Sequence, residues 1–416
     1  MIKIPLSAGM QCRGARDRMS INDFITMMQA NTIDTSICRH FGECGGCAHL
    51  DVDYNTQLQR KHDLLREMLR PFEPHSFRDI LPSPDVYYYR NKMEFSFGGR
   101  KQDPPKLGLK LKKRFDIVVD LQECRLMSPE AVTLIAAIRH WAIAEQLPTY
   151  HNRAHKGFLR YVVMREGKNT GQRMVHLVTA VGTLPESSFV QALDRSGAAI
   201  DTIIWSQTAN VADVAAGEQT RILTGNGLIF EELDGKPFII KPTTFFQTNT
   251  HGAQVVYSII KQAIDECVET LFDIYCGSGS IGLFCADSVS RIIGIESVED
   301  SVIAARENAA LQNVLHAEFI HADAGLFARD TSHHATWSHP SSMIVLDPPR
   351  AGLHKHMRRL LIECPVRKFV YISCNPNALA QDLAYLQDTY SIELIQPVDM
   401  FPHTPHVETV CVLHRK

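Results

Sequence analysis

Segments with the apolar pattern of β-strands alternate with helical segments over residues 241–416, and this alternation constrains the fold more than any other feature. Helical segments are expected at about Gly252–Val268, after Gly279, through Asn308 and over Leu353–Cys364. The strands expected between and beside them are Leu271–Tyr275, Arg291–Ile295, Glu318–His321, Met343–Leu346 and Lys368–Ile372. Strands that alternate with helices form a parallel, doubly wound sheet. Such a sheet binds its ligand at the carboxyl ends of the strands.

The residues before this region show other patterns. Residues 1–37 are expected to be a lead-in segment, and residues 38–70 a cysteine-rich loop followed by an amphipathic helix, Tyr54–Met68, which Pro71 ends. Residues 71–240 combine a helix at Pro129–Glu145 with short β-like runs, which are Met93–Phe97, Phe115–Val119, Arg160–Met164, Met174–Ala180 and Thr202–Trp205. The sequence therefore predicts an α/β protein in which a central α+β domain precedes a C-terminal Rossmann-like domain over residues 241–416.

Composition excludes several classes of protein. The chain has 416 residues, of which 45% are hydrophobic and 21% charged, which is ordinary for a soluble globular protein. No apolar run reaches the roughly 18 residues of a membrane span, and the N-terminus lacks a secretory signal. We therefore expect a cytoplasmic protein, and we expect a monomer. The net charge of −3 argues against a surface covered by positive potential, but a local basic groove would still bind nucleic acid.

Polar residues follow several of the expected strands. The turn Gly277-Ser278-Gly279 would let a ligand approach the backbone amides at the start of a helix. Glu296 ends the second strand, where a carboxylate accepts hydrogen bonds from ribose hydroxyls. Asp323 ends the third strand, facing an adenine, and Asp347-Pro348-Pro349-Arg350 ends the fourth. With a polar lid at Phe245–Asn249, these features favour a site for S-adenosyl-L-methionine over a dehydrogenase site.

A cysteine and a carboxylate complete this set. Cys374 follows an apolar strand and precedes a helix that begins with proline, whereas most cysteines are buried as small apolar residues. A helix N-terminus stabilises a thiolate, so the pKa of Cys374 is expected to be lowered. Glu408 comes just before a final strand at Thr409–Leu413. A thiolate, a base and a methyl donor are together what methylation of a pyrimidine carbon requires.

The order of these motifs resembles the RNA uridine-C5-methyltransferase family, which modifies tRNA and 23S rRNA. The motifs are Phe-x-Gln-x-Asn, Asp-x-Tyr-Cys-Gly-x-Gly, Glu296, Asp-Pro-Pro-Arg, Ser-Cys-Asn-Pro and His-Val-Glu. The resemblance implies that Cys374 is the nucleophile and Glu408 the base. It further implies that S-adenosylmethionine is held by Gln247, Tyr275, Glu296, Asp323 and Asp347. Ser280, which stands where many members have Asn, is a sixth candidate contact, and Ala378 replaces a common Thr.

Four cysteines suggest a further cofactor. Cys38, Cys44 and Cys47 lie in a glycine-rich loop, and Cys124 can join them across the central domain. Four thiolates suit tetrahedral zinc or a 4Fe–4S cluster, and spacing alone leaves both open. The cysteine motif, however, resembles that of the iron–sulfur members that act on 23S rRNA. The resemblance therefore implies a 4Fe–4S cluster with a structural role and a 23S rRNA target, with tRNA as the alternative. Such relatives often begin with a small RNA-binding β-barrel, for which residues 1–37 are too short.

A basic segment spans residues 100–114, with seven basic side chains and one acid, Asp103. A charged run of this kind is often a solvated face. Because Tyr87–Tyr89 and Arg90-Asn91-Lys92 lie nearby in the sequence, RNA phosphate binding is a competing explanation.

Two other functions remain open. A methyltransferase that acts on the amino group of adenine needs no nucleophile, and it usually has an aromatic residue where Arg350 stands. An iron–sulfur RNA-binding protein without catalytic activity would not need the pair of Cys374 and Glu408.

Overall fold

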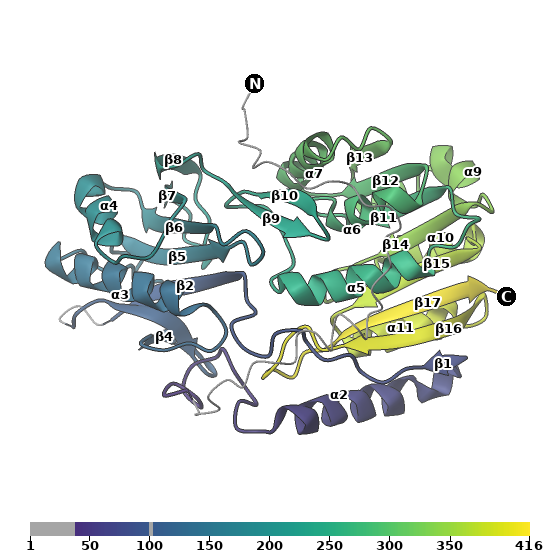
Figure 1. The fold of residues 1–416 in the computed structure, drawn as a ribbon, viewed down its shortest axis with the longest axis horizontal. Helices are drawn as coiled ribbons and strands as arrows, with labels where there is room; N and C mark the ends of the chain where they lie inside the picture. The colour runs from purple at the N-terminus through teal and green to yellow at the C-terminus, as the bar shows by residue number, and fades with distance from the viewer. Residues whose placement is uncertain (1–37, 100–102) are drawn as a thin grey trace, which may run out of the picture. The chain divides into compact units, whose positions relative to one another are not determined.

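A computed structural model describes residues 38–99 and 103–416 (Figure 1). The predicted lead-in segment, and Arg100 and Lys101 of the basic segment, lie outside these residues. The described residues contain two large β-sheets, and both belong to one compact unit.

The larger sheet has eight strands in the order β1-β16-β17-β15-β14-β11-β12-β13. These strands are β1 (Ser76–Phe77), β11 (Thr270–Ile274), β12 (Arg291–Glu296), β13 (Ala317–His321), β14 (Ser342–Leu346), β15 (Lys368–Ser373), β16 (Tyr390–Val398) and β17 (Glu408–Arg415). Strands β11 to β15 are parallel, and β17 pairs antiparallel with both β15 and β16. The prediction of a doubly wound, Rossmann-like sheet is confirmed.

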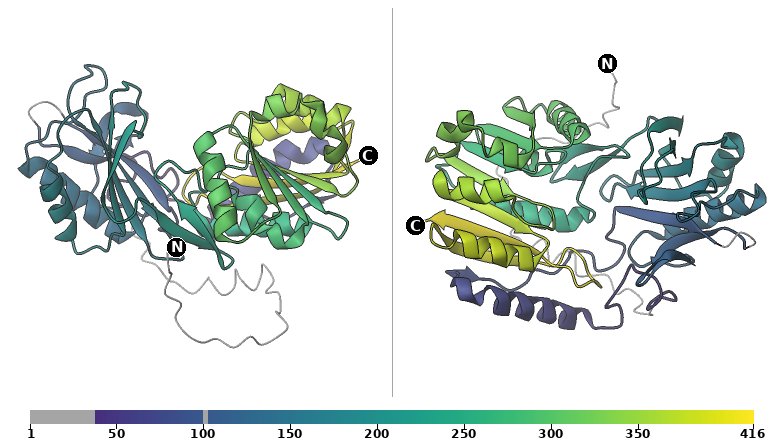
Figure 2. Two further views of the ribbon diagram at one scale, coloured as in Figure 1. Left: turned by 90° about the horizontal axis from the view of Figure 1, so that it is seen from above. Right: turned by 180° about the vertical axis from the view of Figure 1, so that it is seen from behind.

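Helices cover both faces of this sheet (Figure 2). One face carries α5 (Thr250–Ala263), α6 (Ser280–Phe284) and α7 (Glu299–Leu311), which contact one another in turn. The other carries α8 (Ala324–Phe327), α10 (Lys355–Glu363), α11 (Pro376–Leu386) and α2 (Tyr54–Leu69). The remaining short helices are η1 (Arg70–Phe72), η2 (Ala286–Ser288), η3 (Thr331–His333) and α9 (His334–Trp337).

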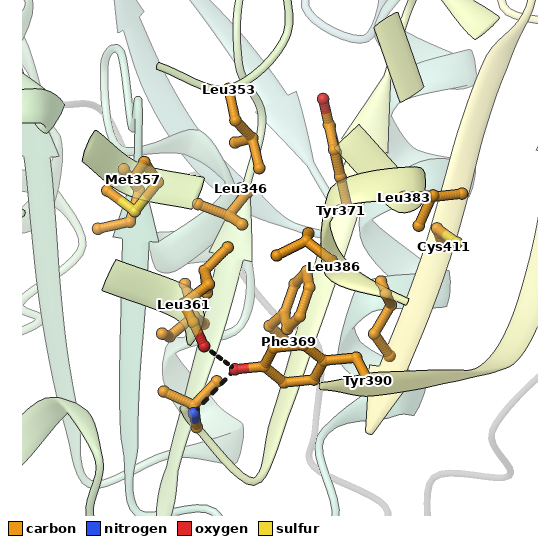
Figure 3. Packing of buried hydrophobic residues seen from close by; sticks show 14 of the residues in the cluster. Leu346, Leu353, Met357, Leu361, Phe369, Tyr371, Leu383, Leu386, Tyr390 and Cys411 are labelled. Atoms are coloured by element: carbon orange, nitrogen blue, oxygen red, sulfur yellow. Dashed lines mark hydrogen bonds between the residues drawn. The ribbon is translucent and has the colours of Figure 1, made fainter. Parts of the chain in front are cut away.

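A buried apolar cluster joins the large sheet to the face that carries α8, α10, α11 and α2 (Figure 3). It includes Leu65 and Leu69 of α2, so this helix packs with the large sheet although it precedes the central region in sequence. Within the cluster, the Tyr390 hydroxyl donates a hydrogen bond to the carbonyl of Leu361 (2.8 Å) and accepts one from the amide of Val366 (3.1 Å). The hydroxyl of this buried aromatic ring is thereby satisfied, as burial requires.

The second sheet has seven strands in the order β4-β3-β2-β5-β6-β7-β8. These strands are β2 (Lys92–Gly98), β3 (Lys106–Leu111), β4 (Arg114–Asp120), β5 (Leu159–Glu166), β6 (Arg173–Ala180), β7 (Thr202–Thr208) and β8 (Gln219–Thr224). Helices α3 (Pro129–Ala144) and α4 (Glu186–Asp194) pack together beside it, and the hairpin of β9 (Ile229–Leu233) and β10 (Lys236–Ile240) precedes the large sheet's region. The predicted α+β character of the central region is confirmed.

None of the helices in the described part of the chain is both long enough and apolar enough to cross a lipid bilayer.

Candidate active site

A cavity of about 1010 Å³ lies at the carboxyl ends of the parallel strands of the large sheet. Seven of the residues predicted from the sequence line it, namely Gln247, Tyr275, Glu296, Asp323, Asp347, Cys374 and Glu408. Because the carboxyl ends of parallel strands meet at one edge of a sheet, residues far apart in the sequence come together there.

Strand register places Cys374 beside Glu408. Strands β15 and β17 are antiparallel, and Ser373 at the end of β15 pairs with Thr409 of β17. Cys374 directly follows β15, and Glu408 directly precedes Thr409, so the two side chains are neighbours at the end of the ladder. The Asn375 side chain caps α11 and also donates a hydrogen bond to the carbonyl of Arg350 (2.8 Å). This bond ties the Cys374 turn to the Asp347–Arg350 loop.

The pKa of Cys374 is shifted in the direction opposite to the prediction. Burial, followed by the nearby carboxyl groups of Glu408 and Asp347, raises this pKa to about 11, whereas the positive charge of Arg350 opposes the increase. The prediction of a lowered pKa was wrong, because it considered the N-terminus of α11 and neither the burial of the thiol nor the carboxyl groups that neighbouring strands bring to the same edge. The resting side chain is therefore a neutral thiol.

Alkylation of Cys374 should test this directly. With a pKa of about 11, the thiolate fraction grows about tenfold for each pH unit below that value, so we expect the rate of carboxamidomethylation by iodoacetamide to rise about a hundredfold from pH 7 to 9. Mass spectrometry of the peptide that contains Cys374 would measure the rate, and the exposed Cys267 in the same sample would monitor the reagent. A rate that levels off below about pH 8 would mean that the site stabilises the thiolate.

Two further carboxyl groups of the cavity have raised pKa values. Burial, followed by the nearby Asp347, raises the pKa of Glu408 well above its ordinary value. Removal from bulk water raises the pKa of Asp347 to about 7, although the Gln247 amide donates a hydrogen bond to its Oδ2 atom (3.2 Å). A carboxylate with a raised pKa is a stronger base once it has lost its proton. Glu408 is therefore suited to remove a proton from a weakly acidic carbon.

At the other end of the cavity, the lining residue Glu296 is held by the glycine-rich turn Gly277–Gly279. Glu296 accepts hydrogen bonds from the backbone amides of Gly277 (3.0 Å), Ser297 (2.7 Å) and Val298 (2.9 Å). Gly279 has φ +76°, and a Cβ atom there would lie 2.8 Å from the Phe319 ring, so only glycine fits this turn. The turn and the carboxylate thus hold each other in place beside the cavity.

Ser280 does not line the cavity. Its side chain is buried at the start of α6, where its hydroxyl is hydrogen bonded to that of Tyr257 (2.9 Å). Its predicted role as a cofactor contact stays a prediction, since the side chain faces α5 and its hydroxyl is engaged there.

Several cavity residues were not assigned from the sequence. They are Arg90 from the central region, Phe401 and His406 from the connection between β16 and β17, and His354 and Lys355 at the start of α10. The Arg90 guanidinium lies 5.9 Å from the centre of the Phe401 ring, close enough for a cation–π contact. Burial, and then the positive charge of Arg350, lowers the pKa of His406, so its ring is neutral. The motif His-Val-Glu, at residues 406–408, indicated that this segment belongs to the active site, but it assigned no role to His406.

Buried hydrogen bonds fix the cavity wall formed by the Phe245–Asn249 segment. The Asn91 side-chain amide donates to the carbonyl of Gln247 and to the hydroxyl of Thr250, both at 2.8 Å. Asn249, which is fully buried, donates to the carbonyl of Met400 (2.8 Å) and caps α5. This segment therefore connects the central region to the strands that carry Cys374 and Glu408.

The four predicted metal-binding cysteines lie near one another as free thiols. Burial, followed by the neighbouring Cys124, Cys44 and Cys38, raises the pKa of Cys47 to about 12. The sulfur of Cys124 also accepts a hydrogen bond from the amide of Leu126 (3.4 Å). Across residues 38–99 and 103–416, no three His, Cys, Asp or Glu side chains have the geometry to bind a metal ion.

The cysteine loop also contacts the connection between β16 and β17. The amides of Ala48 and His49 both donate to the carbonyl of His403, at 2.7 and 3.0 Å. A buried ion pair between Lys61 of α2 and Asp399 (2.7 Å) supports the same connection. The segment that carries His406 and Glu408 is thus held by residues from the N-terminal part of the described chain.

Comparisons with known proteins identify the family. A model of the tRNA (uracil-5-)-methyltransferase family matches residues 191–416. An RNA methyltransferase of Clostridium tetani is 38% identical, over 91% of this chain and 84% of its own length. The tRNA (uracil(54)-C(5))-methyltransferase of Pyrococcus furiosus is 33% identical, over 91% of this chain and 85% of its own length.

A solved structure agrees with these relatives. The tRNA (uracil-54, C5)-methyltransferase of Pyrococcus abyssi, crystallised with S-adenosyl-L-homocysteine, matches with a TM-score of 0.74 and 31% identity, over 91% of this chain and 88% of its own. The chain therefore belongs to the tRNA (uracil-5-)-methyltransferase family, and it is a methyltransferase dependent on S-adenosyl-L-methionine.

Proposed function

We propose that this enzyme transfers a methyl group from S-adenosyl-L-methionine to carbon 5 of a uridine in RNA through a covalent adduct between Cys374 and the uracil. The observation that carries the proposal is the pairing of Ser373 with Thr409, which brings a thiol and a buried carboxyl group together on the wall of one cavity. A methyltransferase that acts on an amino group of adenine would need neither.

In the proposed chemistry, Cys374 is the nucleophile and Glu408 is the base. Cys374 gives its proton to solvent and its sulfur bonds to carbon 6 of uracil, which moves the electron pair of the ring double bond onto carbon 5 as an enolate. Carbon 5 then bonds to the methyl group, and the sulfonium is released as a neutral thioether. Glu408 removes the proton from carbon 5, and the electron pair left behind expels Cys374 from carbon 6. The target base must leave its stack to reach the cavity.

The residues proposed to hold the methyl donor lie beside this pair. Gln247 and Asp347 form one hydrogen-bonded unit, and Asp347 approaches Cys374 closely enough to raise its pKa. Glu296 at the end of β12 and Tyr275 at the end of β11 line the same cavity. A carboxylate at the end of the second strand is suited to ribose hydroxyls, so we assign Glu296 to the ribose. Asp323 is exposed and remains a candidate for the adenine end.

We propose 23S rRNA as the target, because the cysteine motif resembles that of members that act on it. The second candidate is tRNA, since the names of the Pyrococcus relatives state a tRNA uracil as their substrate. We further propose that residues 71–240 form the RNA-binding domain and that the enzyme acts as a cytoplasmic monomer.

Mapping 5-methyluridine in RNA from a strain that lacks the gene would test the proposed function and its target. We expect one 5-methyluridine of 23S rRNA to disappear and to return when the gene is restored. Loss of a tRNA 5-methyluridine instead would support the second candidate. If every 5-methyluridine persists in both RNAs, the proposed function is wrong.

The cysteine loop is proposed to hold a 4Fe–4S cluster through Cys38, Cys44, Cys47 and Cys124. The proximity of the four thiols supports it, as does the amide that donates to the Cys124 sulfur, since hydrogen bonds to sulfur tune such clusters. A cluster presents four separate irons, so its ligands need not converge on one point as they must around zinc. The methyl transfer moves no net electrons, which leaves a structural role.

Iron content should test this proposal. We expect protein purified without oxygen to be brown and to contain about four irons per chain. Substitution of Cys44 or Cys124 by serine should bleach the protein and lower its solubility, because the cysteine loop braces the connection between β16 and β17. Serine at Cys267, an exposed thiol far from the loop in sequence, is the control. A colourless, active protein with one zinc per chain would contradict the cluster.

A further inference from the structure

A groove on the second sheet continues from the catalytic cavity. It has a volume of about 680 Å³ and shares Arg90 and Thr248 with that cavity. A smaller hollow of about 130 Å³ adjoins it and shares Ser96, Lys110, Phe115, Tyr161 and Asp213 with it. The groove and the hollow thus extend the surface of the catalytic cavity along the second sheet without a break in their lining.

The charged residues in the lining of the groove are mainly basic. Its cations are Arg90, Lys92, Lys110, Lys112 and Lys113, and its acids are Glu94 and Asp213. The two acids already form ion pairs, Glu94 with Lys92 and Asp213 with Lys110.

Lys112 and Lys113 form the exposed tip of the groove. Neither has a carboxylate partner among the residues that the structure describes. They occupy the tight turn between β3 and β4, where Leu111 pairs with Arg114. Lys113 has φ +63°, a left-handed conformation that glycine or asparagine adopts at lower cost. Two exposed lysines beside a groove whose acids are already in ion pairs favour a ligand with negative charge.

An exposed aromatic ring stands between the groove and the hollow. Phe115 on β4 lines both, and 78% of its surface is exposed. Ile117, two residues further along the same strand, is 39% exposed and lines neither. A flat, exposed ring beside two exposed lysines is the arrangement with which proteins hold single-stranded nucleic acid, by stacking a base and neutralising phosphates.

We propose that this groove binds the RNA strand that flanks the target uridine, with phosphates at Lys112 and Lys113 and a base stacked on Phe115. The inference rests on the proposed function, because the groove begins where the catalytic cavity ends. Stacking on an aromatic ring does not depend on the identity of the base. The groove therefore contributes affinity for the strand, while the catalytic cavity selects uracil.

Binding of a fluorescein-labelled oligouridylate of about 20 nucleotides to the full chain, with no methyl donor present, would test the proposal. Phe115→Ala should raise Kd about tenfold without changing the salt dependence, because stacking releases no counterions. Lys112→Gln combined with Lys113→Gln should lower the magnitude of the log–log salt slope by about 0.7 for each phosphate that the variant no longer neutralises.

Two matched variants serve as controls. Ile117→Ala removes an exposed apolar side chain from the same strand, and Arg195→Gln removes an exposed cation at the end of α4. Both should bind the RNA like the unchanged chain, and thermal melting should show that all the variants are folded. An unchanged Kd for Phe115→Ala, an unchanged slope for the lysine pair, or an equal effect in the controls would overturn the proposal.

The outcome is independent of catalysis. If the chain bound RNA as expected but methylated no uridine, the groove would stand and the proposed function would fall. If the chain methylated a uridine and the groove variants bound RNA normally, the proposed function would be supported and the groove proposal would be wrong. Under turnover we expect Phe115→Ala to raise the KM for RNA with little change in kcat, since Phe115 lies outside the catalytic cavity.

Discussion

Replacement of Cys374 by alanine is expected to reduce methyl transfer more than a thousandfold, which corresponds to a loss of roughly 4 kcal/mol of transition-state stabilisation. Carbon 5 of uracil is a weak nucleophile until sulfur has added at carbon 6, and the variant lacks that sulfur. The affinity for S-adenosylmethionine should stay nearly unchanged, because the proposed donor contacts come from other strand ends, among them Glu296 and Asp347. Initial rates and calorimetric titration with S-adenosylhomocysteine would measure the two effects.

The control for this variant is Cys267→Ala, which removes an exposed thiol that does not line the cavity. It should keep full activity. A Cys374→Ala enzyme that retains more than about a thousandth of the activity would show that this thiol is not the nucleophile. A large loss of donor affinity would mean that the change had disturbed the cavity rather than the chemistry.

Replacement of Glu408 by glutamine is expected to separate methyl transfer from release of the product. Addition of Cys374 and methylation both precede the step that needs the base. Without a carboxylate to take the proton from carbon 5, the methylated RNA should remain bonded to the enzyme. We expect a protein–RNA band that survives denaturation and carries label from the methyl donor.

This variant should fold normally. Burial raises the pKa of Glu408 and so favours its neutral form over the carboxylate, and glutamine is neutral and has a similar shape. Two controls accompany it. The labelled band should vanish in the double variant with Cys374→Ala, and Glu318→Gln, an exposed change on β13, should accumulate none. A Glu408→Gln enzyme that turns over freely, or that is inactive without forming the adduct, would show that another group removes the proton.

Much of the active site could be predicted because parallel strands end at a common edge. The sequence pattern located β11, β12, β13, β14 and β15 to within about two residues. A polar residue directly after such a strand is thereby assigned to the cavity, and Asp347 and Cys374 were found in this way. Only the helix expected to end at Val268 was clearly misjudged, since Ile264 adopts an extended backbone and ends α5 at Ala263.

The parts that could not be predicted depend on contacts between distant segments. Arg90 reaches the cavity because Asn91 is hydrogen bonded to the Phe245–Asn249 segment, which no local pattern reveals. Strand β16 and the short β1, which extend the large sheet beyond β17, likewise depend on tertiary pairing.

The pKa of Cys374 could not be predicted for the same reason, because it too depends on contacts between distant segments. The local sequence around Cys374 shows a helix N-terminus, which by itself favours a thiolate. The carboxyl groups of Asp347 and Glu408, contributed by the neighbouring β14 and β17 ends, outweigh it together with burial. The hydrogen bond between the Ser280 hydroxyl and Tyr257, a residue of the preceding helix, could likewise not be predicted from the local sequence.

The central claim is that Cys374 bonds to the uracil ring of an RNA substrate, and a fluorinated substrate tests it most directly. Fluorine at carbon 5 cannot leave as a cation, so the final elimination is blocked and the adduct persists. RNA from cells that lack the gene, labelled with 5-fluorouridine, would be incubated with the enzyme and the methyl donor, denatured, digested and analysed by mass spectrometry. We predict a methylated fluorouridine attached to the peptide that contains Cys374. Active enzyme that forms no adduct, or an adduct at another cysteine, would contradict the account.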